Sequence, residues 1–297
     1  MALAIATAGC GLGAGQGTSE VTVTVTRDFG RQPVSSITAR RVPGSETVMR
    51  MLERSFAVQT RYGGGFVQSI NGISGDQQRH DWFYYVNGIQ APRGAAGTAV
   101  HRGDRIWWDL HDWSATESIP AVVGSFPEPF IHGSGGKRLP TTLECAVDVG
   151  AACRTVTAEL EQLGVPVAVQ QPGTGSGTDS LAIVVGTWAD LSGEIVARLI
   201  DHGPSASGVY ARFTGPRGEN LELLDAHGHV ARALGAGAGL IAAAAQSPSQ
   251  PTWLITGTDP SGVRSAAAAL TPSRLRNHFA LAVQGGRDEP VPLVARS

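Results

Sequence analysis

The sequence predicts an α+β protein in which a small mixed-sheet domain is followed by a larger α/β sandwich. A chain of 297 residues suggests about two domains. Hydrophobic residues make up 42% and charged residues 16% of the chain, so a packed core can form and extended disorder is excluded. Expected strands dominate before residue 114, whereas strands and helices alternate after residue 140.

The first expected elements are a strand hairpin and a helix. Valines alternate with threonines over residues 20–28, a pattern typical of a half-buried strand, and residues 34–41 are its expected hairpin partner. Pro43-Gly44-Ser45 then opens a helix that we expect Ser45 to cap. The apolar residues of this helix share one face, and they are Val48, Met51, Leu52 and Phe56.

Several short strands follow this helix. We expect strands around residues 58–62, 66–73 and 82–86, and a turn at Asn87-Gly88. Residues 105–112 form the last expected strand of this part. A helix on one face of a mixed sheet, in the order strand, strand, helix and several strands, predicts a β-grasp-like domain.

The second half carries a different pattern. Residues 114–138 contain three prolines and no period, which indicates a linker or a packed connector. Beyond it we expect strands at 142–147, 165–170, 181–185, 252–256 and 279–283, helices at 151–163, 191–201, 228–245 and 261–270, and a hairpin at 209–224. The predicted organisation is a leader remnant and tether at 1–19, a β-grasp-like domain at 20–115, a connector at 116–139 and an α/β domain at 140–297.

Small residues followed by a cysteine mark the beginning of the chain. Residues 6–10 read Ala-Thr-Ala-Gly-Cys, which resembles a bacterial lipobox, where the cysteine is lipidated and becomes the mature N-terminus. Residues 11–19 are small and suit a flexible tether. No Lys or Arg precedes Cys10, so the basic start of a signal peptide is missing. We expect a lipid anchor at Cys10 on the outer face of the cell membrane; the alternative is an incidental cysteine.

The other two cysteines agree with export. Cys145 and Cys153 lie close in sequence, and in an oxidising compartment they can form a disulfide. Two buried free thiols are the alternative. A zinc site would need further ligands nearby, which this spacing does not offer.

Ordered motifs of the N-terminal part resemble a known family. They are Thr47 to Leu52, Phe66-Val67-Gln68-Ser69-Ile70-Asn71-Gly72-Ile73, Trp82-Phe83-Tyr84-Tyr85-Val86-Asn87-Gly88 and Gly103-Asp104-Arg105-Ile106-Trp107-Trp108. This set, over residues 20–113, is similar to the DUF4430 or transcobalamin-like C-terminal domain. In animal cobalamin carriers such a domain covers one face of the corrinoid, while a helical barrel holds the other. Bacterial relatives are exported, and some are associated with energy-coupling-factor uptake of cobalamin or cobalt. Residues 140–297 resemble no helical barrel and indicate no family.

Aromatic residues of this domain are the candidate ligand contacts. If Ile106, Trp108 and Leu110 face the core, then alternate side chains of the last strand face outward and suit a flat ligand. The alternative is that the second half of the chain covers them. The candidate ligand-binding residues are Trp82, Tyr84, Tyr85, Asn87, Trp107, His111 and Trp113.

No motif predicts catalysis or a metal. His227-Gly228-His229 is a weak metal signal without a carboxylate or cysteine beside it, and reads better as a polar loop. The Gly-rich stretches 173–178 and 235–239 fail the context of phosphate and dinucleotide loops, and no nucleophile elbow occurs. The net charge of −2 gives no reason to expect nucleic acid.

These patterns and the resemblance lead to a functional expectation. We expect an exported, membrane-tethered, non-catalytic binding protein with no cofactor. It would be a capture or accessory component of a cobalamin- or cobalt-type uptake system, with a corrinoid ligand and a membrane transporter as partner. The alternative is a structural or protein-interaction module of the cell envelope that binds no small molecule.

Overall fold

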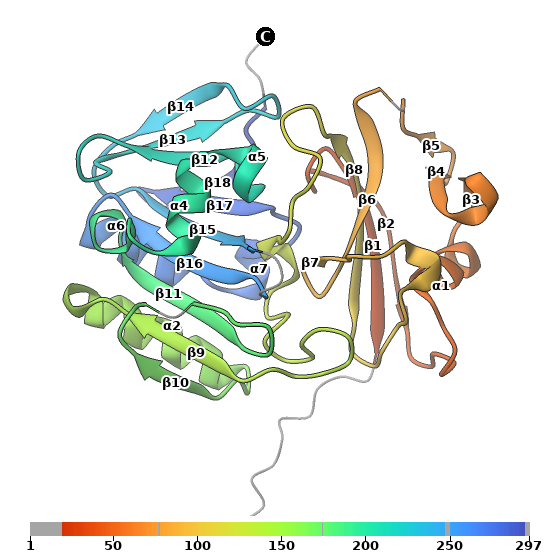
Figure 1. Cartoon of the computed structure of the whole chain (residues 1–297), viewed down its shortest axis with the longest axis horizontal. Helices are drawn as coiled ribbons and strands as arrows, with labels where there is room; N and C mark the ends of the chain where they lie inside the picture. Colours follow the sequence, from red (N-terminus) through yellow and green to blue (C-terminus); the bar gives the residue numbers. More distant parts are fainter. Residues whose placement is uncertain (1–19, 77, 174, 247–249, 295–297) are drawn as a thin grey trace, which may run out of the picture.

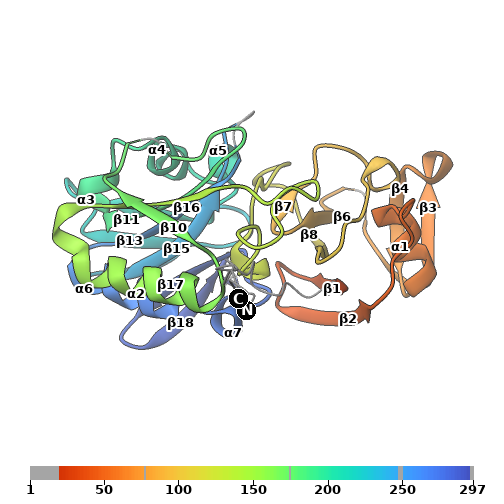
Figure 2. The same ribbon diagram turned by 90° about the horizontal axis from the view of Figure 1, so that it is seen from below.

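Two lobes lie side by side in the computed structural model, which describes residues 20–294 except 77, 174 and 247–249 (Figures 1 and 2). The first lobe comprises residues 20–113 and the second residues 140–294. Cys10 and the expected tether lie outside the described residues. Among the described helices, none has the length and apolar character that a membrane crossing requires.

The first lobe is built on a five-stranded mixed sheet. Its strand order is β2-β1-β8-β6-β7. β1 pairs with β2 in antiparallel and with β8 in parallel orientation. The strands are β1 (Val21–Arg27), β2 (Gln32–Ala39), β6 (His80–Val86), β7 (Ile89–Gln90) and β8 (Arg105–Asp112). The sheet packs its apolar face against helix α1 (Val48–Ser55), as the predicted α+β class requires.

The helix starts two residues later than a Ser45 cap would place it. Thr47 is the N-cap, and its side-chain oxygen accepts a hydrogen bond from the Arg50 backbone at 3.3 Å. Residues 46–48 first pair with residues 98–100 through backbone hydrogen bonds. The predicted Ser45 cap is therefore wrong, because the chain is still extended at residue 47.

A small antiparallel sheet and two short 3-10 turns complete the first lobe. The sheet consists of β3 (Val58–Arg61), β4 (Phe66–Ile70) and β5 (Ile73–Ser74), and the turns are η1 (Tyr62–Gly64) and η2 (Ala95–Gly97). The Asn87-Gly88 turn is present as predicted, with both residues at positive φ. The core of the lobe gathers around Val23, Met51, Leu52, Ile70 and Trp108.

The second lobe is a seven-stranded sheet covered on both faces. Its order is β10-β9-β11-β16-β15-β17-β18, and the pairs among the first four strands are parallel. The strands are β9 (Thr141–Cys145), β10 (Val167–Gln170), β11 (Leu181–Thr187), β15 (Gly239–Ala244), β16 (Thr252–Gly257), β17 (Ala280–Gln284) and β18 (Arg287–Val291).

Two layers enclose this sheet. On one face lie α2 (Gly150–Gln162), α6 (Pro260–Ala269) and α7 (Pro272–Leu275). The other face is covered by α3 (Trp188–Leu191), α4 (Ile195–Asp201), α5 (Pro204–Ser207) and a three-stranded sheet of β12 (Ala211–Thr214), β13 (Asn220–Leu224) and β14 (Val230–Leu234). Two 3-10 turns complete the lobe: η3 (Val123–Ser125) comes before β9 in the chain, and η4 (Val147–Val149) comes directly before α2.

The predicted helix at residues 228–245 is wrong. This segment forms β14 and β15, separated by a turn at residues 235–237. β15 lies between β16 and β17 and is buried along its whole length, so it has no apolar and polar alternation to identify it. A Cβ atom on Gly239 would lie 2.2 Å from the Gly262 carbonyl oxygen of α6. Small residues are therefore needed where the helix packs this closely on the strand.

The connector is packed and not a free linker. Ile119 and Val122 are buried in the core shared by the lobes, and Phe126 and Phe130 are buried in the core beneath the second sheet. The glycine at position 30 shows how closely the lobes approach. It has φ of +81°, and a Cβ there would lie 1.9 Å from the Asn277 carbonyl oxygen.

An aromatic cluster joins the two lobes. The Phe279 ring of the second lobe lies 5.2 Å from Phe29, 5.7 Å from Tyr85 and 5.2 Å from Trp107, measured between ring centroids. These rings belong to one buried core that continues beneath α4. The face of β8 that carries Trp107 is thus covered by the second half of the chain, which is the second of the two alternatives raised by the sequence.

Candidate functional site

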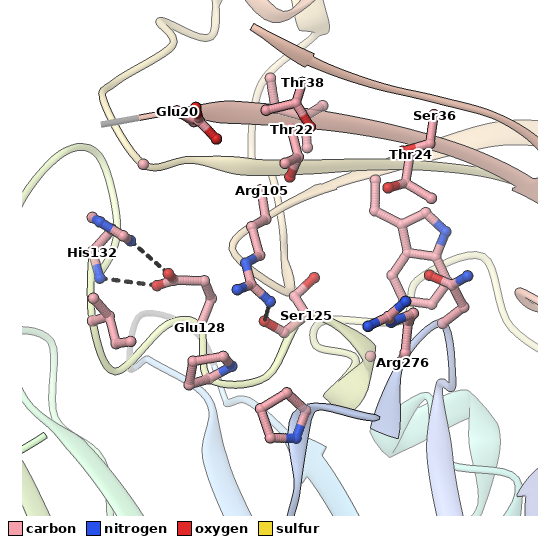
Figure 3. A pocket seen from close by; sticks show the side chains of 18 of the residues that line it. Glu20, Thr22, Thr24, Ser36, Thr38, Arg105, Ser125, Glu128, His132 and Arg276 are labelled. Carbon is pink, nitrogen blue, oxygen red and sulfur yellow. Dashed lines mark hydrogen bonds and ion pairs between the residues drawn. The ribbon is translucent and has the colours of Figure 1, made fainter. Parts of the chain in front are cut away.

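A polar cleft of about 1000 Å³ opens beside this aromatic cluster, between the β1–β2 hairpin and the second lobe (Figure 3). One wall carries hydroxyl groups, and the opposite wall carries guanidinium and imidazole groups. The polar lining residues are Glu20, Thr22, Thr24, Ser35, Ser36, Thr38, Arg105, Ser125, Glu128, His132, Arg138, Gln162, Arg276 and Asn277.

The hydroxyl wall follows from the alternation in β1. The valines of this strand are fully buried in the first core, so its threonines point to the other face. In the antiparallel register, Thr22 lies opposite Thr38 and Thr24 lies opposite Ser36. Four hydroxyl groups therefore form a compact polar surface on one side of the hairpin, as Figure 3 shows.

Arg105, at the start of β8, lies beside Thr22 in the same sheet, and its side chain extends across the cleft toward the connector (Figure 3). Its Nη1 donates to the carbonyl oxygens of Ser125 at 3.3 Å and Phe126 at 2.9 Å, which fixes the guanidinium. Burial lowers the pKa of Arg105, Glu128 opposes that shift, and nearby Arg276 adds to it. Two cations thus lie close enough to influence each other within one cleft.

Arg276 is the exposed member of this pair. Among the described residues it has no hydrogen bond or ion pair within the chain. The guanidinium of Arg138, in contrast, is already hydrogen-bonded within the chain, because its Nη2 donates to the Gly164 carbonyl oxygen at 2.7 Å. Glu20, an acid at the margin of the cleft, is paired with Arg40 at 3.2 Å. Positive charge therefore dominates the centre of the cleft.

Glu128 and His132 form a tight pair on the same wall. Glu128 is buried, and its oxygens lie 2.5 Å from His132 Nδ1 and 2.9 Å from the His132 backbone nitrogen. The hydrogen bond with Glu128 raises the pKa of the His132 imidazole, although burial acts in the opposite direction. Glu128 is therefore paired with His132 and also acts electrostatically on Arg105.

The aromatic residues singled out in the sequence lie mostly inside the molecule. Five of the seven candidates are buried, and they are Trp82, Tyr85, Asn87, Trp107 and His111. Tyr84 and Trp113 are half-buried. Of these seven, Trp107 alone also lines the cleft. An open aromatic face for a flat ligand is therefore not formed by these residues.

Several of the candidates have structural partners instead. Asn87 donates to Asp104 Oδ1 and to the Gly133 carbonyl oxygen, each at 2.9 Å, and so holds the connector against the first lobe. His111 stacks on Phe83 with 4.5 Å between ring centroids. Its Nδ1 lies 3.0 Å from Asp109 Oδ1. These contacts explain why both side chains are buried.

The remaining candidates form local contacts. Tyr84 stacks on Trp108 and is hydrogen-bonded to the Arg93 carbonyl oxygen. Trp113 donates through Nε1 to Asp81 Oδ2 at 3.0 Å. The predicted disulfide between Cys145 and Cys153 is present and joins the end of β9 to α2.

Sequence reasoning missed the cationic wall. Arg105 belongs to one of the family motifs but was not among the candidate ligand contacts, and Arg276 belongs to no motif; the two residues are far apart in the chain. The hydroxyl wall did leave a signal, since the threonine positions of β1 alternate with buried valines. Because the polar face of this strand carries only hydroxyl groups, the sequence could have predicted that no apolar side chains pack against it.

The fold and the cleft define a two-lobed α+β protein with a polar cleft between the lobes. Residues 45–112 match the family described as "Domain of unknown function (DUF4430)", so the resemblance predicted for the first lobe is confirmed. No curated protein sequence matches the chain.

Two solved structures are similar to part of the chain. A chain from Ruminococcus gnavus ATCC 29149, provisionally assigned as a metal binding protein, is 21% identical, with a TM-score of 0.26; the match covers 32% of this chain and 97% of that chain. Haptocorrin in complex with Cbi is 17% identical, with a TM-score of 0.23; the match covers 32% of this chain and 26% of that chain.

Proposed function

We propose that this protein is a non-catalytic binding protein that holds a polar, anionic ligand in the interlobe cleft. The observation that carries the proposal is that Arg105 and Arg276 line the same cleft as the hydroxyl groups of the hairpin (Figure 3). Guanidinium groups recognise phosphate and carboxylate oxygens through charge-assisted hydrogen bonds, and hydroxyls supply further donors. Arg276 is free to contribute such bonds because it has no partner among the described residues.

The size of the cleft supports a large ligand. A volume of about 1000 Å³ is at the upper end of small-molecule sites, which span roughly 300–1000 Å³. Cobalamin combines a large ring with a phosphodiester, and it is therefore the corrinoid that this chemistry favours. Cobinamide lacks that phosphodiester and serves as the matched comparison. The sequence suggests the setting: a chain tethered through Cys10 that delivers its ligand to a membrane transporter.

Calorimetric titration of the purified full chain with cobalamin and cobinamide tests this proposal. We expect cobalamin to bind more tightly than cobinamide. Arg276→Gln should weaken cobalamin binding by at least about tenfold, because a charged hydrogen bond contributes roughly 1.5–3 kcal/mol. Arg93→Gln, an exposed arginine away from the cleft, is the matched control.

Each alternative outcome has a definite meaning. Absence of heat with both corrinoids would remove the corrinoid from the proposal. Equal affinity of the Arg276→Gln variant and the parent chain would place any bound corrinoid outside this cleft. Small phosphates and dicarboxylates, titrated in the same way, would then establish whether the cleft holds anions at all.

A second candidate function is a structural or interaction module of the cell envelope. The packing of Trp107 against Phe279 favours it, because the most aromatic face of the first lobe is used to join the lobes. This function predicts that neither corrinoids nor small anions bind, and that the Arg276→Gln variant behaves like the parent chain in every titration.

A further inference from the structure

A second group of polar side chains lies at the other end of β8, in the turn between β13 and β14. Asp225, His227 and His229 each offer one ligating atom, and these atoms lie within 4.8 Å of one another. Asp225 Oδ1 accepts hydrogen bonds from the backbone nitrogens of His227 at 2.9 Å and His229 at 3.0 Å. The carboxylate therefore folds the turn so that both imidazoles project from the same side.

The two imidazoles are held in similar orientations. Their rings are stacked, with 6.1 Å between centroids and 24° between planes. The side chain of Asp225 is almost buried, whereas His227 is about two-fifths exposed and His229 is 80% exposed. The turn thus presents ligating nitrogens to solvent above a fixed carboxylate, and a metal ion can reach them.

The first lobe contributes a further carboxylate to this group. Asp112 ends β8, and its Oδ2 lies 3.6 Å from His227 Nε2 and 3.9 Å from His80 Nε2. Its side chain is only 9% exposed, so the charge is directed at the two imidazoles. A buried carboxylate behind an imidazole is the arrangement that orients metal-ligating histidines.

We propose that Asp225, His227 and His229 bind a divalent transition metal ion of the zinc type, and that Asp112 orients His227 from the opposite lobe. Imidazole nitrogen and carboxylate oxygen are ligands that zinc accepts, and three protein ligands leave a coordination position open. The weak histidine signal of the sequence becomes a site because the fold adds the two carboxylates. This site is separate from the anion cleft: Arg105 and Asp112 are the two ends of β8, roughly 23 Å apart for seven strand steps.

The proposed metal would lie beside a contact between the two lobes. Its three ligands belong to the turn between β13 and β14 of the second lobe, and Asp112 of the first lobe contacts one of them, His227. Because the ion binds the folded chain, it should also stabilise that chain by mass action.

The test is a calorimetric titration of the chelator-treated full chain with zinc chloride, repeated with nickel and copper. We expect one equivalent of metal and a rise in melting temperature. His229→Ala should weaken binding at least tenfold, and because this side chain is largely exposed, the fold is retained, as circular dichroism can verify. Asp112→Asn should weaken binding by about 10- to 100-fold. His202→Ala, an exposed histidine in another part of the second lobe, should bind like the parent chain.

The proposal is overturned if none of the three metals gives heat or a melting shift. It is equally overturned if binding survives intact in both His227→Ala and His229→Ala, since the metal would then be held elsewhere, for example by Cys10. Binding that is lost in His229→Ala but unchanged in Asp112→Asn would remove Asp112 from the site.

Discussion

At the scale of single residues, His132 is where pH acts on the cleft. Its pKa in the folded chain lies above the ordinary value of 6.5 because of the hydrogen bond with Glu128. A raised folded pKa means that the stabilisation is complete below about 6.5 and is lost as pH rises through the raised value.

We therefore predict a pH-dependent effect of His132→Asn. The variant should be less stable than the parent chain at about pH 6, and the difference should shrink as the pH rises through the raised pKa toward about pH 9. Urea unfolding at both pH values measures it, with His202→Asn as control. A difference of the same size at both pH values would contradict the assignment.

Replacement of Asp109 should strongly lower the stability of the fold. It is fully buried and accepts hydrogen bonds from Thr26 Oγ1 at 2.5 Å, from Phe29 N at 3.0 Å and from Gly30 N at 2.8 Å. Its carboxylate thus holds the turn between β1 and β2 against β8.

We predict that Asp109→Ala lowers the free energy of unfolding by about 3 kcal/mol or more, because three donors lose a charged acceptor in the interior. Urea unfolding is the measurement. Asp179→Ala, at an exposed ion pair with Lys137, should change stability by no more than about 0.5 kcal/mol. Similar small effects of both substitutions would show that the turn does not depend on Asp109.

At the scale of elements, most strands were predictable, among them the almost wholly buried β11 and β16, whereas the equally buried β15 was not. β1 and β8 were placed correctly because each has distinct residue types on its two faces. β15 consists of Gly, Leu, Ile and Ala, a composition that also suits a helix, and its burial between two strands is decided by tertiary contacts alone. β18 was missed for a related reason, since its exposed residues are charged and it includes a proline.

The cleft was unpredictable for a different physical reason. Its hydroxyl wall is local to one hairpin, but Arg105 and Arg276 meet only after the two sheets have packed together. The aromatic residues gave the stronger sequence signal, yet the same apolar character that made them conspicuous drives them into the interface between the lobes. Polar ligand contacts assembled from distant loops leave no comparable pattern.

Close packing of α6 on β15 gives a prediction at this scale. Gly239→Val should destabilise the chain by about 1–3 kcal/mol, because the new side chain meets the Gly262 carbonyl of α6. Gly235→Ala, where a Cβ has no neighbour within 4 Å, is the control and should be nearly neutral. Thermal unfolding compares the two, and a neutral Gly239→Val would contradict the packing described for this strand.

At the scale of the whole molecule, the shared aromatic core should make the lobes unfold together. Phe279 contacts rings from three segments of the first lobe, so the lobes share one core in addition to the core that each has of its own. We expect a single calorimetric transition for the parent chain.

Phe279→Ala should lower the free energy of unfolding by about 3–5 kcal/mol and reduce the melting temperature accordingly. Val147→Ala, at a position that is 82% exposed, is the control and should leave the transition unchanged. Two separate transitions in the parent chain, or an unaltered melting temperature in Phe279→Ala, would show that the lobes are thermodynamically independent.

The aromatic cluster also bears on how such a domain can be exchanged between genes. A fragment ending near residue 113 would uncover Phe29, Tyr85 and Trp107, which are buried in the intact chain. Apolar patches of this kind promote self-association in water. The domain that matches DUF4430 is therefore not independent of the rest of this chain. If recombination transferred it to another protein, that protein would also have to provide apolar residues that pack against these aromatic side chains.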